Sequence, residues 1–317
     1  METERPSPRY SRIDAWEPAE ILDAMIEGQL AAVAAVRAAR ASLESAALAI
    51  EQKLGAGGRL VYVGAGTSGR LAVQDGAELA PTFGWPQDKL LLLIAGGEDA
   101  LLKAVEGAED ESARAIELMR RHGVGRADVL IALAASGTTP FTLACLREAK
   151  RAGALVIGVA NNRDTPLLAE ADHAIFLDTG PEVIAGSTRM KAGAAQRTAL
   201  LLLSSLVMIL LGRVFDGLMV DVQASNKKLV RRSEKILARL TGRGAEEIDA
   251  ALRRSGGSVK LAFLLLQGWE HAEAEAALSA AHGHLRRAFE TLDARRAGIA
   301  AQTPGGSTVG LKKPTPS

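Results

Sequence analysis

The sequence predicts an α/β fold: a doubly wound parallel sheet flanked by helices, with further helices before it and a small helical domain after it. Two observations lead to this prediction. Short continuous apolar runs alternate with longer stretches of helical periodicity, a pattern typical of buried parallel strands joined by crossover helices. Two of these runs end in loops rich in glycine and hydroxyl side chains, which is typical of the ligand-binding edge of such sheets.

The elements follow in chain order. A polar arm at residues 1–17 is interpreted as extended, and residues 19–54 show a periodicity that predicts two helices. Glycines in residues 55–58 end these helices before the first strand. Residues 98–122 predict one long helix between the second and third strands. The predicted strands are the apolar runs 60–63, 90–94, 129–133, 155–159 and 174–177.

Helical patterns dominate the rest of the chain. An apolar helix is expected at 192–211, followed by amphipathic helices over 225–254 and 259–292. The end of the chain is rich in proline, glycine, serine and threonine, which predicts disorder. The expected organisation is an N-terminal arm with helices at 1–51, an α/β domain at 52–216, a helical domain at 217–300 and a disordered tail at 301–317.

Composition excludes several function classes. The net charge of +1 gives no basic field for nucleic acid. The single cysteine, Cys145, falls in an apolar helical pattern and is interpreted as a core thiol. The histidines form no metal-binding pair, and His282 and His284 are interpreted as surface residues. The N-terminus lacks an apolar signal core, and the apolar stretch 198–211 is shorter than a bilayer span. We therefore expect a cytoplasmic protein without metal, membrane or nucleic acid.

The most informative segment is the first strand with its following loop, RLVYVGAGTSGR at residues 59–70. Glycines let the backbone approach a ligand closely, and the free N–H groups of a helix N-terminus favour an anion. A second loop, AASGTTP at 134–140, follows another strand. Because both loops lie at the carboxyl edge of the sheet, we predict that they bind one phosphorylated small molecule. The expected contacts are Gly66, Thr67, Ser68, Ser136, Gly137, Thr138 and Thr139.

The first loop also matches the G-x-G-x-x-G spacing of dinucleotide-binding sites. Hydroxyl side chains occupy the two positions between its second and third glycines. A dinucleotide-binding site also needs an acidic residue at the end of a second strand, about twenty residues later. At that distance, residues 85–89 are instead interpreted as a loop. Neither loop continues into the Gly-Lys-Ser/Thr of a Walker A sequence. These departures favour a phosphorylated small molecule over NAD, and no cofactor is expected.

Seven segments give the chain a resemblance to the N-acetylmuramic acid 6-phosphate etherase family. They are GAGTSGR, DGAELAPTFGWP, LIAGG, AVEGAED, AASGTTP, EVIAGSTRMKAG and LMVDVQASNKKL, in this order. The resemblance covers residues 52–230 and extends more weakly into the helical tail. Since this family belongs to the sugar isomerase (SIS) superfamily, the resemblance implies a flavodoxin-like phosphosugar-binding domain at 52–216, a phosphorylated amino sugar as substrate, and a homodimer.

The resemblance also implies a lyase reaction in amino-sugar and peptidoglycan recycling. The D-lactyl ether of N-acetylmuramic acid 6-phosphate is eliminated and water is added, giving N-acetylglucosamine 6-phosphate and D-lactate. The family's two catalytic glutamates map onto Glu78, as acid for the leaving oxygen, and Glu109, as base at C2. By spacing alone, Glu106, Glu109 and Asp110 remain open. Glu78 has apolar sequence neighbours that would suit an acid, although a glutamate at a helix end is ordinarily a solvated surface group.

Further site residues are implied in the segment GSTRMK. Ser187 and Thr188 are expected either to contact the ligand or to cap the helix that follows. Lys191, with Arg189 nearby, would hold an anion such as the lactyl carboxylate or pair with acidic neighbours. The chain departs from the family pattern at several positions, among them Leu79, Ala80 and Thr138, where the family usually carries cysteine, proline and arginine.

Two other functions remain open at this point. A phosphosugar isomerase on the same fold would share the hydroxyl loops and need a single base, and it would release no lactate. A non-enzymatic sugar-phosphate-binding regulator would need neither glutamate. The apolar stretch 198–211 is a candidate dimer interface, or alternatively part of the core of its own domain.

Overall fold

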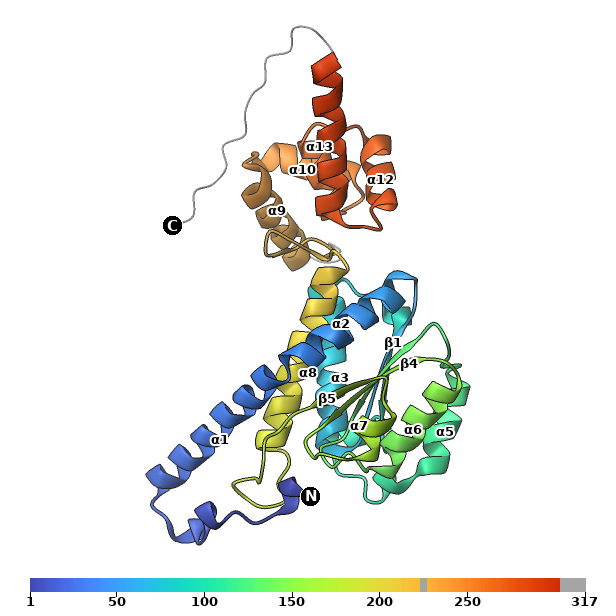
Figure 1. Cartoon of the computed structure of the whole chain (residues 1–317). Coiled ribbons are helices and arrows are strands. Elements are labelled where there is room, and N and C mark those ends of the chain that lie inside the picture. Colours follow the sequence, from blue (N-terminus) through green and yellow to red (C-terminus); the bar gives the residue numbers. More distant parts are fainter. Residues whose placement is uncertain (223–226, 303–317) are drawn as a thin grey trace. The chain divides into compact units, whose positions relative to one another are not determined.

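The computed structural model describes residues 1–222 and 227–302, and the chain forms two compact units, Met1–Leu211 and Gly212–Ser317. Figure 1 shows the chain coloured from the N-terminus to the C-terminus. The N-terminal helices belong to the first unit together with the sheet. The expected disordered tail lies outside the described residues, except for residues 301 and 302, which end the last helix.

The first unit is built on one five-stranded parallel sheet, so the predicted fold class is confirmed. The spatial order is β2-β1-β3-β4-β5, in which the chain reverses its winding direction beside β1. Ligands of doubly wound sheets bind at this reversal, outside the carboxyl ends of the strands. The strands are β1 (Leu60–Gly64), β2 (Leu90–Ile94), β3 (Val129–Leu133), β4 (Leu155–Ala160) and β5 (His173–Phe176).

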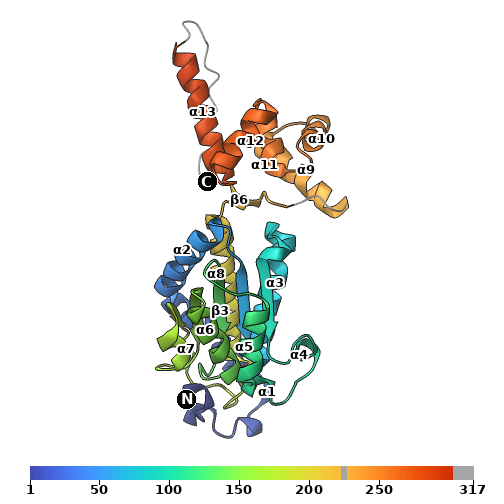
Figure 2. The same cartoon turned by 90° about the vertical axis from the view of Figure 1, so that its right-hand side faces the viewer.

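Each face of the sheet is covered by helices, because side chains alternate between the faces along each strand. Leu60 and Tyr62 point into one core with α2 (Arg40–Gly55), α3 (Gly66–Phe83) and α8 (Lys191–Leu210). Val61 and Val63 point into the other, whose helices are α5 (Ser112–Arg121), α6 (Pro140–Arg151) and α7 (Pro166–Glu170). Figures 1 and 2 show these two helical layers.

The N-terminal arm is not simply extended, whereas the predicted helix that follows it is present as α1 (Pro18–Ala38). The arm contains three short 3-10 turns, η1 (Glu2–Glu4), η2 (Pro8–Tyr10) and η3 (Ile13–Ala15). A capping box between Glu17 and Glu20 then starts α1. The helix α1 packs against α8 and projects beyond the sheet in Figure 1.

The prediction of one long helix at 98–122 is wrong. The structure has α4 (Asp99–Leu102), η5 (Ala108–Asp110) and α5 instead. Gly107 adopts a positive φ of 74°, a backbone conformation that a continuous right-handed helix cannot contain. A further short turn, η4 (Gln87–Lys89), precedes β2.

The helix α8 is longer than the apolar run that predicted it. It has 20 residues and is the one described helix that is long and apolar enough to cross a membrane by length and composition. The expectation that this segment is too short is therefore wrong. Half of its apolar window is buried inside the protein, against α1, α2 and α3, as in the core helix of a globular domain.

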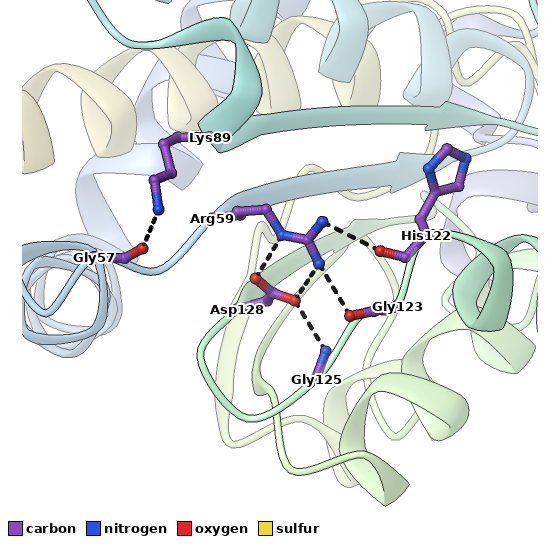
Figure 3. A network of polar contacts seen from close by, with 7 residues as sticks. All are labelled: Gly57, Arg59, Lys89, His122, Gly123, Gly125 and Asp128. Atoms are coloured by element: carbon purple, nitrogen blue, oxygen red, sulfur yellow. Dashed lines mark hydrogen bonds and ion pairs between the residues drawn. The ribbon is translucent and has the colours of Figure 1, made fainter.

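Polar contacts join the strands at their amino ends, opposite the ligand-binding edge (Figure 3). Arg59, just before β1, donates to both carboxylate oxygens of Asp128, just before β3, over 2.9 and 2.8 Å. The same guanidinium donates to the carbonyl oxygens of His122 and Gly123. Burial favours a protonated Asp128, but the hydrogen bonds and charge of Arg59, together with the hydrogen bond from Gly125 N, outweigh it and lower the pKa of this carboxyl.

The second unit begins with a short hairpin, β6 (Val214–Phe215) and β7 (Leu218–Met219). The sequence also predicts a break at Thr241 and Gly242, and α9 does end there, where Gly242 adopts a positive φ of 67°. The second predicted amphipathic stretch is divided further, since Gly268 adopts a positive φ of 85°. Phe263 packs between Phe215 and Phe289, with ring centroids 5.3 and 5.5 Å apart. The helices are α9 (Lys227–Thr241), α10 (Ala245–Arg254), α11 (Val259–Leu266), α12 (His271–Ala280) and α13 (Leu285–Gln302).

Candidate functional site

Backbone hydrogen bonds align the loops at the carboxyl edge of the sheet. Ala95 N donates to Gly64 O over 3.1 Å, which joins the loops after β1 and β2. Asn161 N donates to Ala135 O over 3.0 Å, which joins the loops after β3 and β4. Gly64 at the end of β1 also pairs with Leu133 at the end of β3, so the two predicted hydroxyl loops begin on neighbouring strands.

The loop after β1 leads directly into α3 and leaves the N-terminus of this helix without a side-chain cap. Strand and helix are so close that a Cβ on Gly69 would lie 2.8 Å from Gly64 O, so only glycine fits there. Gly66 is exposed and Thr67 is half-buried. Uncapped N–H groups beside a hydroxyl are a suitable environment for a phosphate.

Ser68 differs from its expected role as an open ligand contact. It is buried, and its hydroxyl donates to Gln196 Oε1 over 2.8 Å. Gln196 Nε2 in turn donates to Asn161 Oδ1 over 2.9 Å, and Asn161 donates to Leu177 O. This buried chain joins α3, α8, β4 and β5. The sequence analysis missed Gln196 and Asn161, whose only signal is a polar residue within an apolar segment.

The loop after β3 is shaped by hydrogen bonds between its own hydroxyl groups. Ser136 Oγ lies 3.2 Å from Thr139 Oγ1 and accepts a hydrogen bond from Thr138 N. Gly137 has a φ of 69°, and a Cβ there would lie 2.3 Å from Thr165 Oγ1. This Thr165 hydroxyl is buried and has no hydrogen-bond partner among the described residues. Glycine is therefore required at position 137, and Thr138 is the exposed member of the loop.

Glu182, which the sequence analysis missed, caps α8. Its carboxylate accepts hydrogen bonds from Lys191 N over 2.9 Å and Ala192 N over 2.8 Å. The expectation that Ser187 or Thr188 could cap this helix is therefore wrong. Both are half-buried, and in the described part of the chain neither hydroxyl has a hydrogen-bond partner, so both remain available to a ligand.

Lys191 is less accessible than expected of an anion-binding residue. It is only 5% exposed, and its aliphatic stem lies against Gly28 of α1, where an added Cβ would be 3.2 Å from it. Burial lowers the pKa of the Lys191 ammonium group, while nearby Glu182 opposes this change. The lysine therefore faces the α1–α8 contact.

The extreme N-terminus also lies at this edge, which the sequence did not predict. Thr3 is fully buried, and Asn162 Nδ2 donates both to Thr3 Oγ1 over 3.0 Å and to Ala135 O over 2.8 Å. Thr3 O accepts from Gly186 N over 3.1 Å. The arm therefore joins the loop that carries Ser136 to the loop that precedes α8.

Glu78 lies away from these loops within one chain. It is on α3, twelve residues after Gly66, and a rise of 1.5 Å per residue separates the two by about 18 Å along the helix. Its apolar sequence neighbours do not enclose it, because Leu79 points into the core while Glu78 is exposed. The expected apolar setting of this glutamate is therefore absent in the single chain.

A half-buried carboxyl group lies one turn before Glu78. Asp75 accepts hydrogen bonds from Tyr62 Oη over 2.7 Å and from Ser204 Oγ over 3.1 Å. Burial raises the pKa of Asp75, and the two hydrogen bonds oppose it. These contacts hold the middle of α3 against β1 and α8, and they fix the turn from which Glu78 projects.

Glu109 is exposed and lies in η5, not in the long helix predicted from the sequence. The neighbouring Ala108 is buried in the same cluster as Phe141, and η5 packs against α6. Glu109 is thereby held near the helix that follows the Ser136 loop. Glu106 and Asp110 are also exposed, so exposure alone does not distinguish the three acids.

Other reactive residues lie outside this edge. Cys145 is buried as predicted, and burial raises the pKa of its thiol to about 12. His282 is exposed, but His284 is half-buried against Gly212, so its assignment to the surface is wrong. Within the described residues, no three His, Cys, Asp or Glu side chains are placed to hold a metal ion.

Comparison with protein families gives two matches to this domain. Residues 42–150 match the family model of the glucokinase regulatory protein N-terminal SIS domain. Residues 108–206 match the SIS domain model. Together these matches cover the sheet and the loops at its carboxyl edge.

Similar proteins cover almost the whole chain. An N-acetylmuramic acid 6-phosphate etherase of Deinococcus radiodurans is 49% identical over 286 residues, which are 90% of this chain and 94% of the relative. Etherases of Streptomyces avermitilis and Geobacillus thermodenitrificans are 42% and 40% identical, covering 91% and 92% of this chain and 93% and 99% of their own length.

Proposed function

The chain belongs to the N-acetylmuramic acid 6-phosphate etherase family, and we propose that it releases D-lactate from N-acetylmuramic acid 6-phosphate as a cytoplasmic carbon–oxygen lyase. The observation that carries the proposal is the uncapped N-terminus of α3 at Gly66 and Thr67. Such a helix end suits the 6-phosphate. Ser136, Thr138 and Thr139 supply further hydroxyl donors.

The reaction begins with opening of the sugar ring to its aldehyde, which acidifies the proton on C2. Glu109 removes this proton, and the electron pair forms the C2–C3 double bond as the C3–O bond breaks. Glu78 protonates the departing lactyl oxygen, and D-lactate leaves. Water then adds at C3 with Glu78 as base, while Glu109 returns a proton to C2. Such acid–base steps typically contribute about 10²- to 10⁴-fold each.

We infer that this site is completed by a second copy of the chain. The separation of about 18 Å along α3 is much longer than a hexose phosphate, so Glu78 cannot act on a sugar whose phosphate binds at Gly66 of the same chain. In a two-fold dimer, Glu78 of the partner subunit can approach the Glu109 and hydroxyl loops of the first. The homodimer is then a requirement of catalysis.

The surface that would form this dimer is apolar. Leu22, Ile26, Leu30 and Val33 lie along one face of α1 and are between 55 and 66% exposed. On α8, Leu201 and Leu202 are 55 and 50% exposed, although the rest of that helix is largely in the core. Contiguous exposed apolar side chains of this kind mark protein interfaces.

The function is tested by isotopic labelling of the products. The purified protein is incubated with N-acetylmuramic acid 6-phosphate in D₂O enriched in ¹⁸O, and the products are analysed by NMR and mass spectrometry. The proposal predicts unlabelled D-lactate oxygen, with ¹⁸O at C3 and deuterium at C2 of N-acetylglucosamine 6-phosphate. Incorporation of ¹⁸O into the lactate hydroxyl would contradict cleavage of the C3–O bond. Absence of lactate would contradict the etherase function and favour a phosphosugar isomerase or a regulator.

A further inference from the structure

The segment that leads from β2 to Glu109 has little support of its own, whereas η5 itself packs against α6 through Ala108. Between β2 and η5, residues 96–107 are exposed except for Ala100, and Leu102 is 95% exposed. The chain enters this segment through Gly96 and Gly97, which both have positive φ angles. Figure 2 shows the segment with α4 extending away from the sheet. An exposed segment of this kind opens easily unless specific contacts hold it.

Arg70 supplies such a contact from α3. Its Nε donates to Ala100 O over 2.8 Å, and its Nη2 donates to Lys103 O over 3.1 Å. These atoms form one edge of the planar guanidinium group, so the two hydrogen bonds fix both the position and the orientation of the segment. They reach both ends of the stretch from Ala100 to Lys103.

The same contacts argue against a direct role for Arg70 in binding the substrate. The Nε–Nη2 edge is the one that grips a carboxylate or phosphate in two-pronged recognition. Here that edge is committed to backbone carbonyl oxygens. Arg70 forms no ion pair with a described acidic residue, so the carbonyl oxygens are its observed partners.

We propose that Arg70 is the positioning residue for Glu109, because it ties the Glu109 segment to the helix whose N-terminus receives the phosphate. Arg70 follows Thr67 by one turn of α3, so the two lie on neighbouring positions of that helix. When the substrate orders the N-terminus of α3, the contacts of Arg70 thereby also order the segment that leads to the base, Glu109. This inference rests on the proposed etherase function and adds a residue to it.

The test compares Arg70→Met with Arg70→Lys and with a matched control, Arg147→Met. Arg147 also makes a two-pronged contact, over 2.7 and 2.6 Å, with Glu170 on α7, outside the site. Hydrogen–deuterium exchange of residues 99–110 and steady-state lactate release are measured for each protein. The primary isotope effect on kcat is measured with substrate deuterated at C2.

Arg70→Met is expected to exchange faster over 99–110 and to lose about 10²-fold in kcat, since small misplacements of a catalytic group cost this much. KM should change less than kcat, and the C2 isotope effect should increase because proton removal becomes slower. The kcat and the exchange rate of Arg70→Lys should lie between those of Arg70→Met and wild type, because an ammonium group can reach only one carbonyl at a time. Arg147→Met should resemble wild type.

Two results would overturn the inference. An unchanged kcat, with or without faster exchange, would show that Arg70 does not position the base. A raised KM with unchanged kcat would make Arg70 a substrate-binding residue. Failure of the proposed function itself is distinguishable, because it appears as absence of lactate release in the wild-type protein.

Discussion

The hydroxyl of Ser68 donates a hydrogen bond to Gln196 Oε1 over 2.8 Å, and this bond joins the start of α3 to the second turn of α8. Gln196 also donates to Asn161 at the end of β4. Ser68 therefore organises the ligand-binding edge from within.

Replacing Gln196 tests this arrangement. Gln196→Leu leaves Ser68 and Asn161 buried with unmade hydrogen bonds, and each orphaned polar group costs about 1–3 kcal/mol. We expect the free energy of unfolding, measured by urea denaturation, to fall by about 2–4 kcal/mol. Gln52→Leu, at an exposed position of α2, should change stability by less than about 0.5 kcal/mol. A loss for Gln196→Leu no larger than for Gln52→Leu would contradict this account.

Gly137 provides a second test, because its positive φ and its contact with Thr165 act separately. Gly180 has a similar φ of 62°, but nothing lies within 4 Å of an added Cβ. Gly180→Ala should therefore cost about 1 kcal/mol from backbone strain alone. Gly137→Ala should cost a further 1–3 kcal/mol or so from overpacking against Thr165. Equal thermal stabilities of the two variants would contradict the steric argument.

Asp128 should make the stability of the first unit depend on acid pH. Its pKa is lowered in the folded state, so the carboxylate contributes stability above the unfolded value near 3.9, and this contribution is lost as the pH falls below that value. Asp128→Ala should cost about 2 kcal/mol at pH 7, because Arg59 loses its carboxylate partner and keeps only the carbonyl oxygens of His122 and Gly123.

Thermal denaturation between pH 7 and 2 checks this expectation. The difference in melting temperature between wild type and Asp128→Ala should be largest at neutral pH and should decrease in acid. Asp178→Ala removes an exposed ion pair with Arg163 and serves as the control, with little effect at any pH. A difference for Asp128→Ala that is constant over this range would contradict the assignment.

The apolar face of α1 predicts the oligomeric state. A charge at Leu30, which is 66% exposed in the single chain, would be buried without a partner in a dimer. Leu30→Asp should therefore yield monomers in sedimentation experiments and lose lactate release, whereas Gln29→Asp, at the neighbouring exposed position, should remain dimeric. A dimeric Leu30→Asp would place the interface elsewhere.

The sequence predicted the sheet well because buried parallel strands are continuous apolar runs. All five runs became strands, including 60–63 and 129–133 with their hydroxyl loops. Periodicity failed at 98–122, where apolar spacing continued through a glycine that the backbone uses to turn.

Contacts between distant segments were outside the reach of pattern analysis. Thr3 and Asn162 are 159 residues apart, and no local signal relates them. Glu182 caps a helix that begins nine residues later, at Lys191, whereas local rules favoured Ser187 and Thr188. Glu109 is preferred to Glu106 because of the family resemblance. Both residues are exposed, so exposure gives no independent reason to prefer one of them.

The central claim is that Glu78 and Glu109 from different subunits form one active site, and complementation tests it most directly. Glu78→Gln and Glu109→Gln should each lower D-lactate release by about 10²- to 10⁴-fold, while Glu106→Gln keeps wild-type activity. When equal amounts of the two variants are unfolded together and refolded, half of the dimers that form are hybrids. Each hybrid has one site with both glutamates and one site with neither. Mixing should therefore restore about a quarter of wild-type activity. Wild-type release by either glutamine variant alone, or no recovery in a mixture shown to contain hybrid dimers, would contradict the account.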